Sequence, residues 1–263
     1  MTLFDTHTHY FDGRFAAEFP GGAAEAIRLS RKAGVSRFLS CGTNAENSGS
    51  SVALAKSEAG FYAAVGLHPE DCFPLSGETL EKELSDIRAM LSLPGVVAIG
   101  EIGLDYHYPD ETDKEKQAYV LEQQLRWAEN TGLPVVIHSR DAAGDTFDIL
   151  RKHSGIRGVL HSFSGSPEMA RQYAALGWYI SFSGTVSYKT AERVRECVRV
   201  TPRDKLLIET DCPYLAPVPH RGKINYSGYL PNTCRAVAEA IGMTPDDIAE
   251  LTFKNACRLF GIS

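Results

Sequence analysis

Short apolar runs alternate with segments of helical spacing along the whole chain of 263 residues. This alternation constrains the fold most, because strands that alternate with helices build parallel βαβ units. The predicted strands cover residues 2–9, 35–42, 61–69, 95–105, 133–140, 158–164, 178–184 and 205–213. The predicted helices cover roughly 22–33, 44–58, 78–92, 113–131, 144–153, 167–176, 190–200, 228–241 and 245–260. Eight such units in about 250 residues predict an α/β protein with a (β/α)8 barrel of the TIM type.

An open, doubly wound sheet is the alternative fold. It is disfavoured because no glycine-rich phosphate-binding turn follows the first predicted strand. No linker or low-complexity tract divides the chain, so we expect a single domain over residues 1–263. The segment 216–232 is rich in Pro, Gly and Asn and predicts a long functional loop after the eighth strand.

Two helices carry clear start signals. Ser166 precedes Pro167, and Thr244 precedes Pro245, so each pair predicts an N-cap residue followed by proline in the first turn. Gly177 and Gly261 follow the same two helices at the position where a left-handed C-terminal residue is common.

Charge and composition narrow the function classes. The formal net charge of −6 argues against a broad basic surface that grips nucleic acid, but it permits a small pocket for one phosphate. No apolar run approaches the roughly 18 residues of a membrane helix, and the first residues do not resemble a secretion signal. We therefore expect a cytoplasmic protein with no membrane contact. None of the six cysteines form a CxxC pair, so neither a zinc knuckle nor a redox motif is indicated, and free thiols are expected because a chain of this length carries no secretion signal.

Histidines concentrate at the carboxyl ends of the predicted strands, where a barrel assembles its chemistry. Any one of them alone is more typical of a hydrogen-bonded core histidine, but five together with nearby carboxylates indicate a metal site. His7 and His9 lie two positions apart on one strand and would share a face. The five histidines are His7, His9, His68, His138 and His161, and the carboxylates near them include Glu101, Asp105, Glu209 and Asp211.

The ordered series "DTHTH", "GLHPE", "IGEIGLDYHY", "PVVIHSRDA", "LHSFSGS" and "ETDCPYLAP" resembles the TatD family of metal-dependent deoxyribonucleases. That family belongs to the broader amidohydrolase-like barrel superfamily. The resemblance extends from Asp5 to the C-terminal "KNACRLFG". It implies hydrolysis of DNA phosphodiester bonds, stepwise from the 3′ end, by a water molecule activated by two divalent metal ions.

The resemblance also implies a ligand set. One ion would be held by His7, His9, Glu101 and Asp211, and the second by Glu101, His138 and His161, so that Glu101 bridges the two. Asp211 and Glu101 are the predicted catalytic residues, and Asp211 would accept the proton of the attacking water. Imidazoles with carboxylates suit Zn²⁺, Mn²⁺ or Fe²⁺, whereas the family resembles Mg²⁺-dependent enzymes, so the identity of the metal stays open.

Other residues are expected to bind substrate. His68 resembles the family's substrate-side histidine, although a turn histidine without function is the alternative. Arg140, His220 and Arg221 would contact phosphate, helped by Lys223; a salt bridge from Arg140 to Asp141 and plain solvation of the loop residues are the alternatives. Glu209 would either orient metal ligands from behind or close an internal ion pair.

Three functions remain to be separated. The first is hydrolysis of single-stranded DNA at a strand end, with no obligate protein partner. Capture of one strand end needs few phosphate contacts, which the negative net charge permits. The second is hydrolysis of a small anionic ester, lactone or amide by the same metals. The third, a catalytically silent scaffold, is disfavoured because the ligand set is intact. A thiol nucleophile at Cys72 or Cys212 is disfavoured, since Cys212 would face away from Asp211 and Cys72 lacks an activating partner.

Overall fold

The computed structural model describes residues 1–263, which divide into two compact units. The first unit comprises Met1–Ser40 and His161–Ser263, and the second comprises Cys41–Leu160. The prediction of one domain over the whole chain is not tested by this division and stays a prediction.

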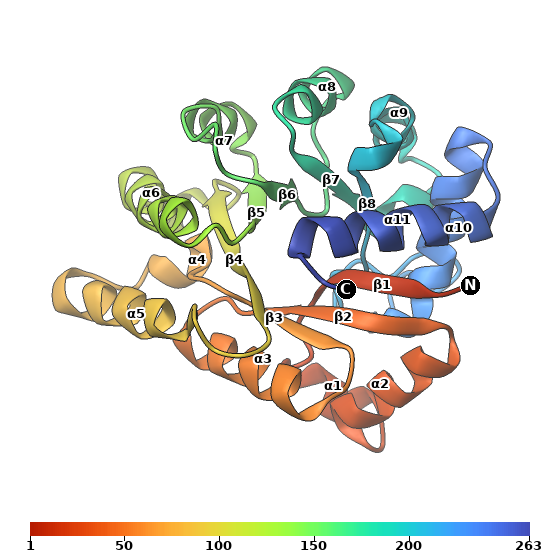
Figure 1. Ribbon diagram of the computed structural model, residues 1–263, viewed down its shortest axis with the longest axis horizontal. Coiled ribbons are helices and arrows are strands. Elements are labelled where there is room, and N and C mark those ends of the chain that lie inside the picture. The colour runs from red at the N-terminus through yellow and green to blue at the C-terminus, as the bar shows by residue number, and fades with distance from the viewer. The chain divides into compact units, whose positions relative to one another are not determined.

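The first unit contains both ends of the chain. Its strands are β1 (Leu3–Thr8), β2 (Val35–Cys41, which reaches the boundary), β7 (Tyr179–Phe182) and β8 (Leu206–Ile208). Its helices are α1 (Arg14–Glu18), α2 (Gly22–Lys32), α8 (Pro167–Ala175), α9 (Glu192–Val200), α10 (Leu230–Ile241) and α11 (Pro245–Phe260), with short 3-10 turns η2 (Gly184–Ser187), η3 (Arg203–Lys205) and η4 (Ser227–Tyr229). α11 packs against β1 and β8 (Figure 1).

The second unit contains β3 (Phe61–Val65), β4 (Val96–Asp105), β5 (Val135–Arg140) and β6 (Gly158–Leu160), paired in parallel in that order. Its helices are α3 (Ala45–Ser57), α4 (Pro69–Cys72), α5 (Gly77–Met90), α6 (Lys114–Thr131) and α7 (Ala143–Leu150), with the 3-10 turn η1 (Pro109–Glu111). α6 packs against β4 (Figure 1).

Strand order confirms the predicted fold class. The eight strands follow one another in the sheet in chain order, from β1 to β8, and Thr8 forms a parallel bridge with Cys212 just after β8. Sequential parallel strands separated by helices are the topology of a (β/α)8 barrel. The strands are buried almost throughout, as their continuous apolar character predicts for a sheet covered by helices.

Both predicted helix starts are confirmed. The Ser166 side chain accepts a hydrogen bond from the backbone N–H of Met169, and the Thr244 side chain accepts one from Asp247. Gly177 and Gly261 have positive φ, as expected for residues that follow a helix.

Several strand boundaries differ from the sequence prediction. β6 ends at Leu160 rather than at residue 164, so His161 follows the strand. β8 stops at Ile208 rather than continuing to residue 213, and Asp211 lies at a φ of 57°, which regular strands exclude. The predicted strand 61–69 also ends early, because His68 and Pro69 start the short helix α4. The His68 ring nitrogen Nδ1 accepts the backbone N–H of Glu70, so a side chain caps this helix. α1 was not predicted.

None of the helices combines the length and the apolar composition that crossing a membrane requires.

The backbones of β4 and β5 approach closely at Gly103, because a Cβ there would collide with the backbone carbonyl of His138. We therefore expect Gly103→Ala to push the two strands apart and to lower the free energy of unfolding by about 3 kcal/mol. Urea denaturation measures the change. The matched control is Gly144→Ala in α7, where a Cβ meets no atom within 4 Å; it should be neutral or stabilise by up to about 1 kcal/mol. Equal stability of the two variants would contradict the close approach.

Candidate metal centres

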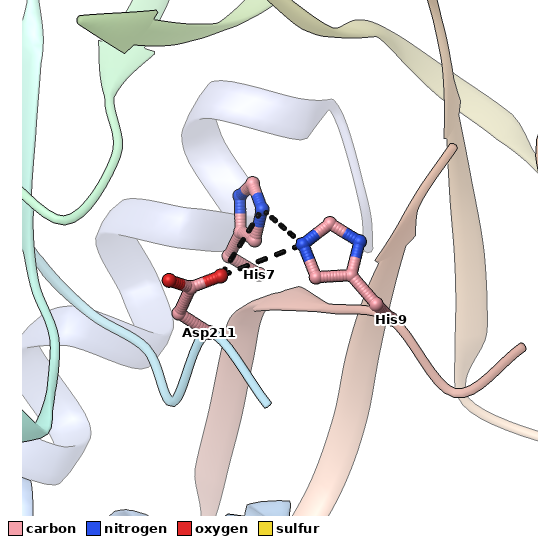
Figure 2. Close-up of side chains that lie close together, drawn as sticks. All are labelled: His7, His9 and Asp211. Atoms are coloured by element: carbon pink, nitrogen blue, oxygen red, sulfur yellow. Dashed lines mark hydrogen bonds and ion pairs between the residues drawn. The ribbon is translucent and has the colours of Figure 1, made fainter. Parts of the chain in front are cut away.

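His7, His9 and Asp211 converge in the first unit (Figure 2). His7 lies near the end of β1, His9 follows that strand, and Asp211 comes from the segment after β8. The two Nε2 atoms are 3.1 Å apart, and Asp211 Oδ1 lies 3.8 Å from Nε2 of His7 and 3.4 Å from that of His9. Both imidazoles are buried, with exposures of 0% and 5%. Two nitrogen atoms and one carboxylate oxygen therefore face one point.

Hydrogen bonds from neighbouring segments fix the backbone that carries Asp211. The Asp5 carboxylate accepts the backbone N–H of Thr210 at 2.8 Å and its hydroxyl at 2.6 Å. The Asn225 amide donates to the Thr210 carbonyl oxygen at 2.9 Å. A non-glycine residue at positive φ costs about 1–3 kcal/mol, so these bonds hold Asp211 in a conformation that it would not adopt alone.

Glu209 and His161 extend this group around His7. The rings of His7 and His161 stack with centroids 4.0 Å apart, and His161 Nδ1 lies 3.3 Å from Glu209 Oε1. The same oxygen accepts the backbone N–H of Ser162 at 2.7 Å, whereas the buried Oε2 has no hydrogen-bond partner. These two groups share His7, and together they form the first cluster: His7, His9, His161, Glu209 and Asp211.

The second unit carries its own group, the second cluster, formed by His68, Glu101 and His138. Glu101 Oε1 lies 2.9 Å from Nδ1 of His138 and 3.5 Å from Nε2 of His68. The other nitrogen of His138, Nε2, lies 2.8 Å from Asp105 Oδ2. The structure therefore places the predicted substrate-side His68 beside Glu101 and His138, and adds Asp105 behind His138.

Sequence reasoning gave Asp105 no role, although a signal was present. Asp105 lies four positions after Glu101 on β4, so both side chains fall on the same face of the strand. The position of His138 between Glu101 and Asp105 depends on the pairing of β5 with β4, which a local sequence pattern does not reveal.

His68 has a defined hydrogen-bonding state. Its Nδ1 accepts the backbone N–H of Glu70 at 3.2 Å and must carry a lone pair. In the neutral ring the proton then resides on Nε2, the atom that faces Glu101. His68 is therefore arranged to donate a hydrogen bond from Nε2.

Both clusters fit a divalent metal ion. In each group of three residues the candidate ligand atoms lie within 4.8 Å of one another, and they combine imidazole nitrogen with carboxylate oxygen. In the second cluster the lone pairs come from Glu101 and His138, because Nε2 of His68 carries a proton. The unpartnered Glu209 Oε2 adds an acceptor that a cation would satisfy. The predicted bridging by Glu101, and the predicted sharing of one ion by His138 and His161, join residues of both units and stay predictions.

The carboxylates of Asp211 and Asp105 are stabilised in the ionised form. Burial works to raise the pKa of Asp211, but the hydrogen bond to His9 and the charges of His7 and His161 lower it below the ordinary value. Burial also works to raise the pKa of Asp105, but hydrogen bonds from His138 and from the backbone N–H of His107 lower this pKa below the ordinary value. Ionised carboxylates are the form that ligates metal or orients a histidine.

The predicted phosphate-binding residues lie against aromatic rings. The Arg140 guanidinium lies 5.3 Å from the ring centroid of Tyr108, and that of Arg221 lies 4.6 Å from Tyr188. His220 stacks on Tyr229 at 3.7 Å, and burial and Lys223 lower its pKa. The alternative of a salt bridge between Arg140 and Asp141 is not found, because Asp141 pairs with His107 at 2.8 Å. Their contact with phosphate stays a prediction.

The six cysteines are free thiols, as predicted. Burial raises the pKa of Cys72 and Cys197 to about 11 and of Cys234 to about 12, and it raises that of Cys212 well above the ordinary value. At pH 8 a pKa of 11 lowers the thiolate fraction by about two orders of magnitude. We expect Ellman's reagent at pH 8 to modify rapidly only Cys257, the one partly exposed thiol, and all six after unfolding. Rapid reaction of Cys72 or Cys212 in the folded protein would reopen a thiol mechanism.

A variant pair distinguishes the two roles considered for Glu209. Its Oε1 lies beside His161 Nδ1, which indicates a residue that orients a histidine. Glu209→Ala should weaken metal binding by about 10–100-fold, whereas Glu209→Gln, which keeps an acceptor oxygen, should lose less than about tenfold. Competition with a chromophoric chelator measures both affinities. If Gln is as damaging as Ala, the charge of Glu209 itself is required, as it is for a direct ligand.

Comparison with known proteins agrees with this geometry. Residues 4–261 match the family described as TatD related DNase. The chain is 37% identical to the metal-dependent hydrolase YabD of Bacillus subtilis, over 99% of this chain and 100% of that protein. It is 35% identical to a metal-dependent hydrolase, TatD, of Mycobacterium tuberculosis, over 99% and 98% of the two chains. The crystal structure of the TatD homologue YjjV from Escherichia coli superposes with a TM-score of 0.90 at 30% identity, covering 99% of this chain and 98% of that one. The chain therefore belongs to the TatD family of metal-dependent hydrolases.

Proposed function

We propose that this protein is a deoxyribonuclease that uses divalent metal ions to cleave DNA phosphodiester bonds from the 3′ end of a strand. The observation that carries the proposal is the pair of imidazole–carboxylate clusters, in a chain that matches the TatD related DNases over residues 4–261. The resemblance to the family implies two ions, and the presence of two clusters supports that number.

Two bound divalent ions would lower the pKa of a water molecule and stabilise the attacking and leaving oxygens at phosphorus. His7, His9 and Asp211 would hold one ion, and Glu101 and His138 would contribute to holding the other. Asp211 would accept the proton of the attacking water; His9, His7 and His161 offset the effect of burial on its pKa, so the carboxylate is ionised and able to act as a base at neutral pH.

His68 supplies the hydrogen-bond donor of the site. Its Nε2–H would bind a phosphate oxygen or steady the leaving oxygen, since Nδ1 is already engaged with the start of α4. Arg140 and Arg221 would add charge to the phosphate contact. The net charge of −6 suits capture of one strand end, which needs few phosphate contacts and gives activity a weak dependence on salt.

A second candidate is hydrolysis of a small anionic ester, lactone or amide. Metal ligands do not define a substrate, and the same clusters would serve such a reaction. Arg140, Arg221 and the donor His68 favour an anion in either case.

The test uses full-length protein that is stripped with a chelator and reloaded with Mg²⁺, Mn²⁺ or Zn²⁺. Single-stranded oligonucleotides labelled at either end are then incubated with wild type, with Glu101→Ala, and with Glu239→Ala, a control on the exposed surface of α10. We expect the 5′-labelled strand to shorten stepwise and the 3′ label to be released first. Glu101→Ala should reduce the rate by at least about 100-fold, and the control should behave as wild type.

A different result would redirect the assignment. If the reloaded wild type binds two ions but leaves both labelled strands intact, DNA is not the substrate. A panel of small phosphoesters, lactones and amides on the same preparation then tests the second candidate.

A further inference from the structure

We propose that Asp105 is a positioning residue that selects the metal-binding tautomer of His138, and that Gln117 of α6 holds Asp105 in place. The inference rests on the metal binding proposed above and concerns only residues of the second unit. It starts from one geometric fact: each ring nitrogen of His138 faces a different carboxylate.

The two nitrogens of His138 have different tasks. Nε2 lies 2.8 Å from Asp105 Oδ2, and Nδ1 lies 2.9 Å from Glu101 Oε1. A neutral imidazole carries one proton. When a metal ion lies between Nδ1 and Glu101, Nδ1 must supply a lone pair, so the single proton lies on Nε2 and is donated to Asp105. A carboxylate behind a histidine is a common way to orient a metal ligand and to increase its basicity.

Asp105 is held from three directions. Its Oδ1 accepts the backbone N–H of His107 at 2.8 Å, which leaves Oδ2 for His138. Its own backbone N–H donates to Gln117 Oε1 at 2.9 Å, and Gln117 Nε2 donates back to the Asp105 carbonyl oxygen at 2.9 Å. Asp105 is 3% exposed and Gln117 is 2% exposed. The Gln117 amide thus bonds both backbone groups of Asp105, the last residue of β4, in the way that a neighbouring strand would.

α6 repeats this device one heptad later. Gln124 accepts the backbone N–H of Leu67 at 2.8 Å and donates to the Leu67 carbonyl oxygen at 3.1 Å. Seven residues are nearly two helical turns, so both glutamines share one face of α6. Leu67 is the sequence neighbour of His68, and Asp105 is the hydrogen-bond partner of His138, so each glutamine holds a residue next to a member of the second cluster. Buried amides are stable only when hydrogen-bonded, and here their partners are the segments that carry the second cluster.

The experiment uses metal-free protein and then titrates it with Zn²⁺. The variants are Asp105→Ala, Asp105→Asn and Gln117→Leu. Gln123→Leu is the matched control, because Gln123 lies on the same helix, is only partly buried and does not contact Asp105. Nitrogen NMR of ¹⁵N-histidine protein at pH 8 reports which nitrogen of His138 is protonated, with the signal assigned from a His138→Gln sample. Chelator competition gives the stepwise Zn²⁺ affinities, and thermal melting reports folding.

In the wild type we expect His138 to be protonated on Nε2. Asp105→Ala removes the acceptor at Nε2 and leaves Glu101 beside Nδ1, so the proton should move to Nδ1 and the binding of one Zn²⁺ ion should weaken by about 10–100-fold. Asp105→Asn has only one acceptor oxygen for two N–H donors. With that oxygen on the backbone N–H of His107, the amide NH₂ faces Nε2 of His138, so this variant should also favour the Nδ1-protonated ring and weaken Zn²⁺ binding at least as much as Asp105→Ala. Gln117→Leu should change both readouts in the direction of Asp105→Ala, and Gln123→Leu should change neither.

A single Nε2-protonated tautomer and unchanged affinity in folded Asp105→Ala would overturn the proposal. If that variant does not fold, Gln117→Leu decides: a lower melting temperature with unchanged tautomer and affinity would overturn the positioning role. Neither readout uses DNA, so an error in the proposed substrate leaves both results unaffected.

Discussion

Burial of imidazoles together with carboxylates is the constraint on which the rest of this structure depends. Removing a charged or polar group from water costs several kcal/mol unless a partner replaces the lost hydration. In the first cluster the partners come from β1, from His161 and from the segment after β8, and in the second they come from the start of α4, β4 and β5. The strand ends are therefore polar networks set in apolar surroundings, and each functional side chain is oriented by another buried group.

A second layer of buried polar residues holds these networks in register. Asp5 of β1 accepts two hydrogen bonds from Thr210, which lies between Glu209 and Asp211. These bonds fix the residues after β8 relative to β1. Gln117 and Gln124 do the same for the ends of β4 and β3. None of these residues belongs to a cluster, yet each is fully or almost fully buried. These side chains form hydrogen bonds with backbone groups that lie beyond the regular strand pairing. Without them the segments that carry the clusters would be less rigid.

The chemistry-bearing residues could be predicted largely because period-two strands and their carboxyl ends are local features. His7, His9 and His138 lie at or next to strand ends, as the pattern predicted, and Glu101 lies within the fourth strand. The prediction was less accurate where the chain departs from the strand. Asp211 was expected within the eighth strand, but β8 ends at Ile208 and Asp211 lies at positive φ, so strand alternation does not place its side chain. His68 was expected in a strand and instead caps a short helix.

The sequence by itself determined the eightfold alternation of strands and helices, the two helix caps and the identity of the groups available at the strand ends. These depend on interactions within a few residues. The tertiary structure decided which of those groups meet: that His161 stacks on His7 and faces Glu209, and that Asp105 stands behind His138. Such pairings depend on the spacing between strands and on helices such as α6 packing against them. Contacts between residues distant in sequence follow from packing of the whole sheet, which no local pattern encodes.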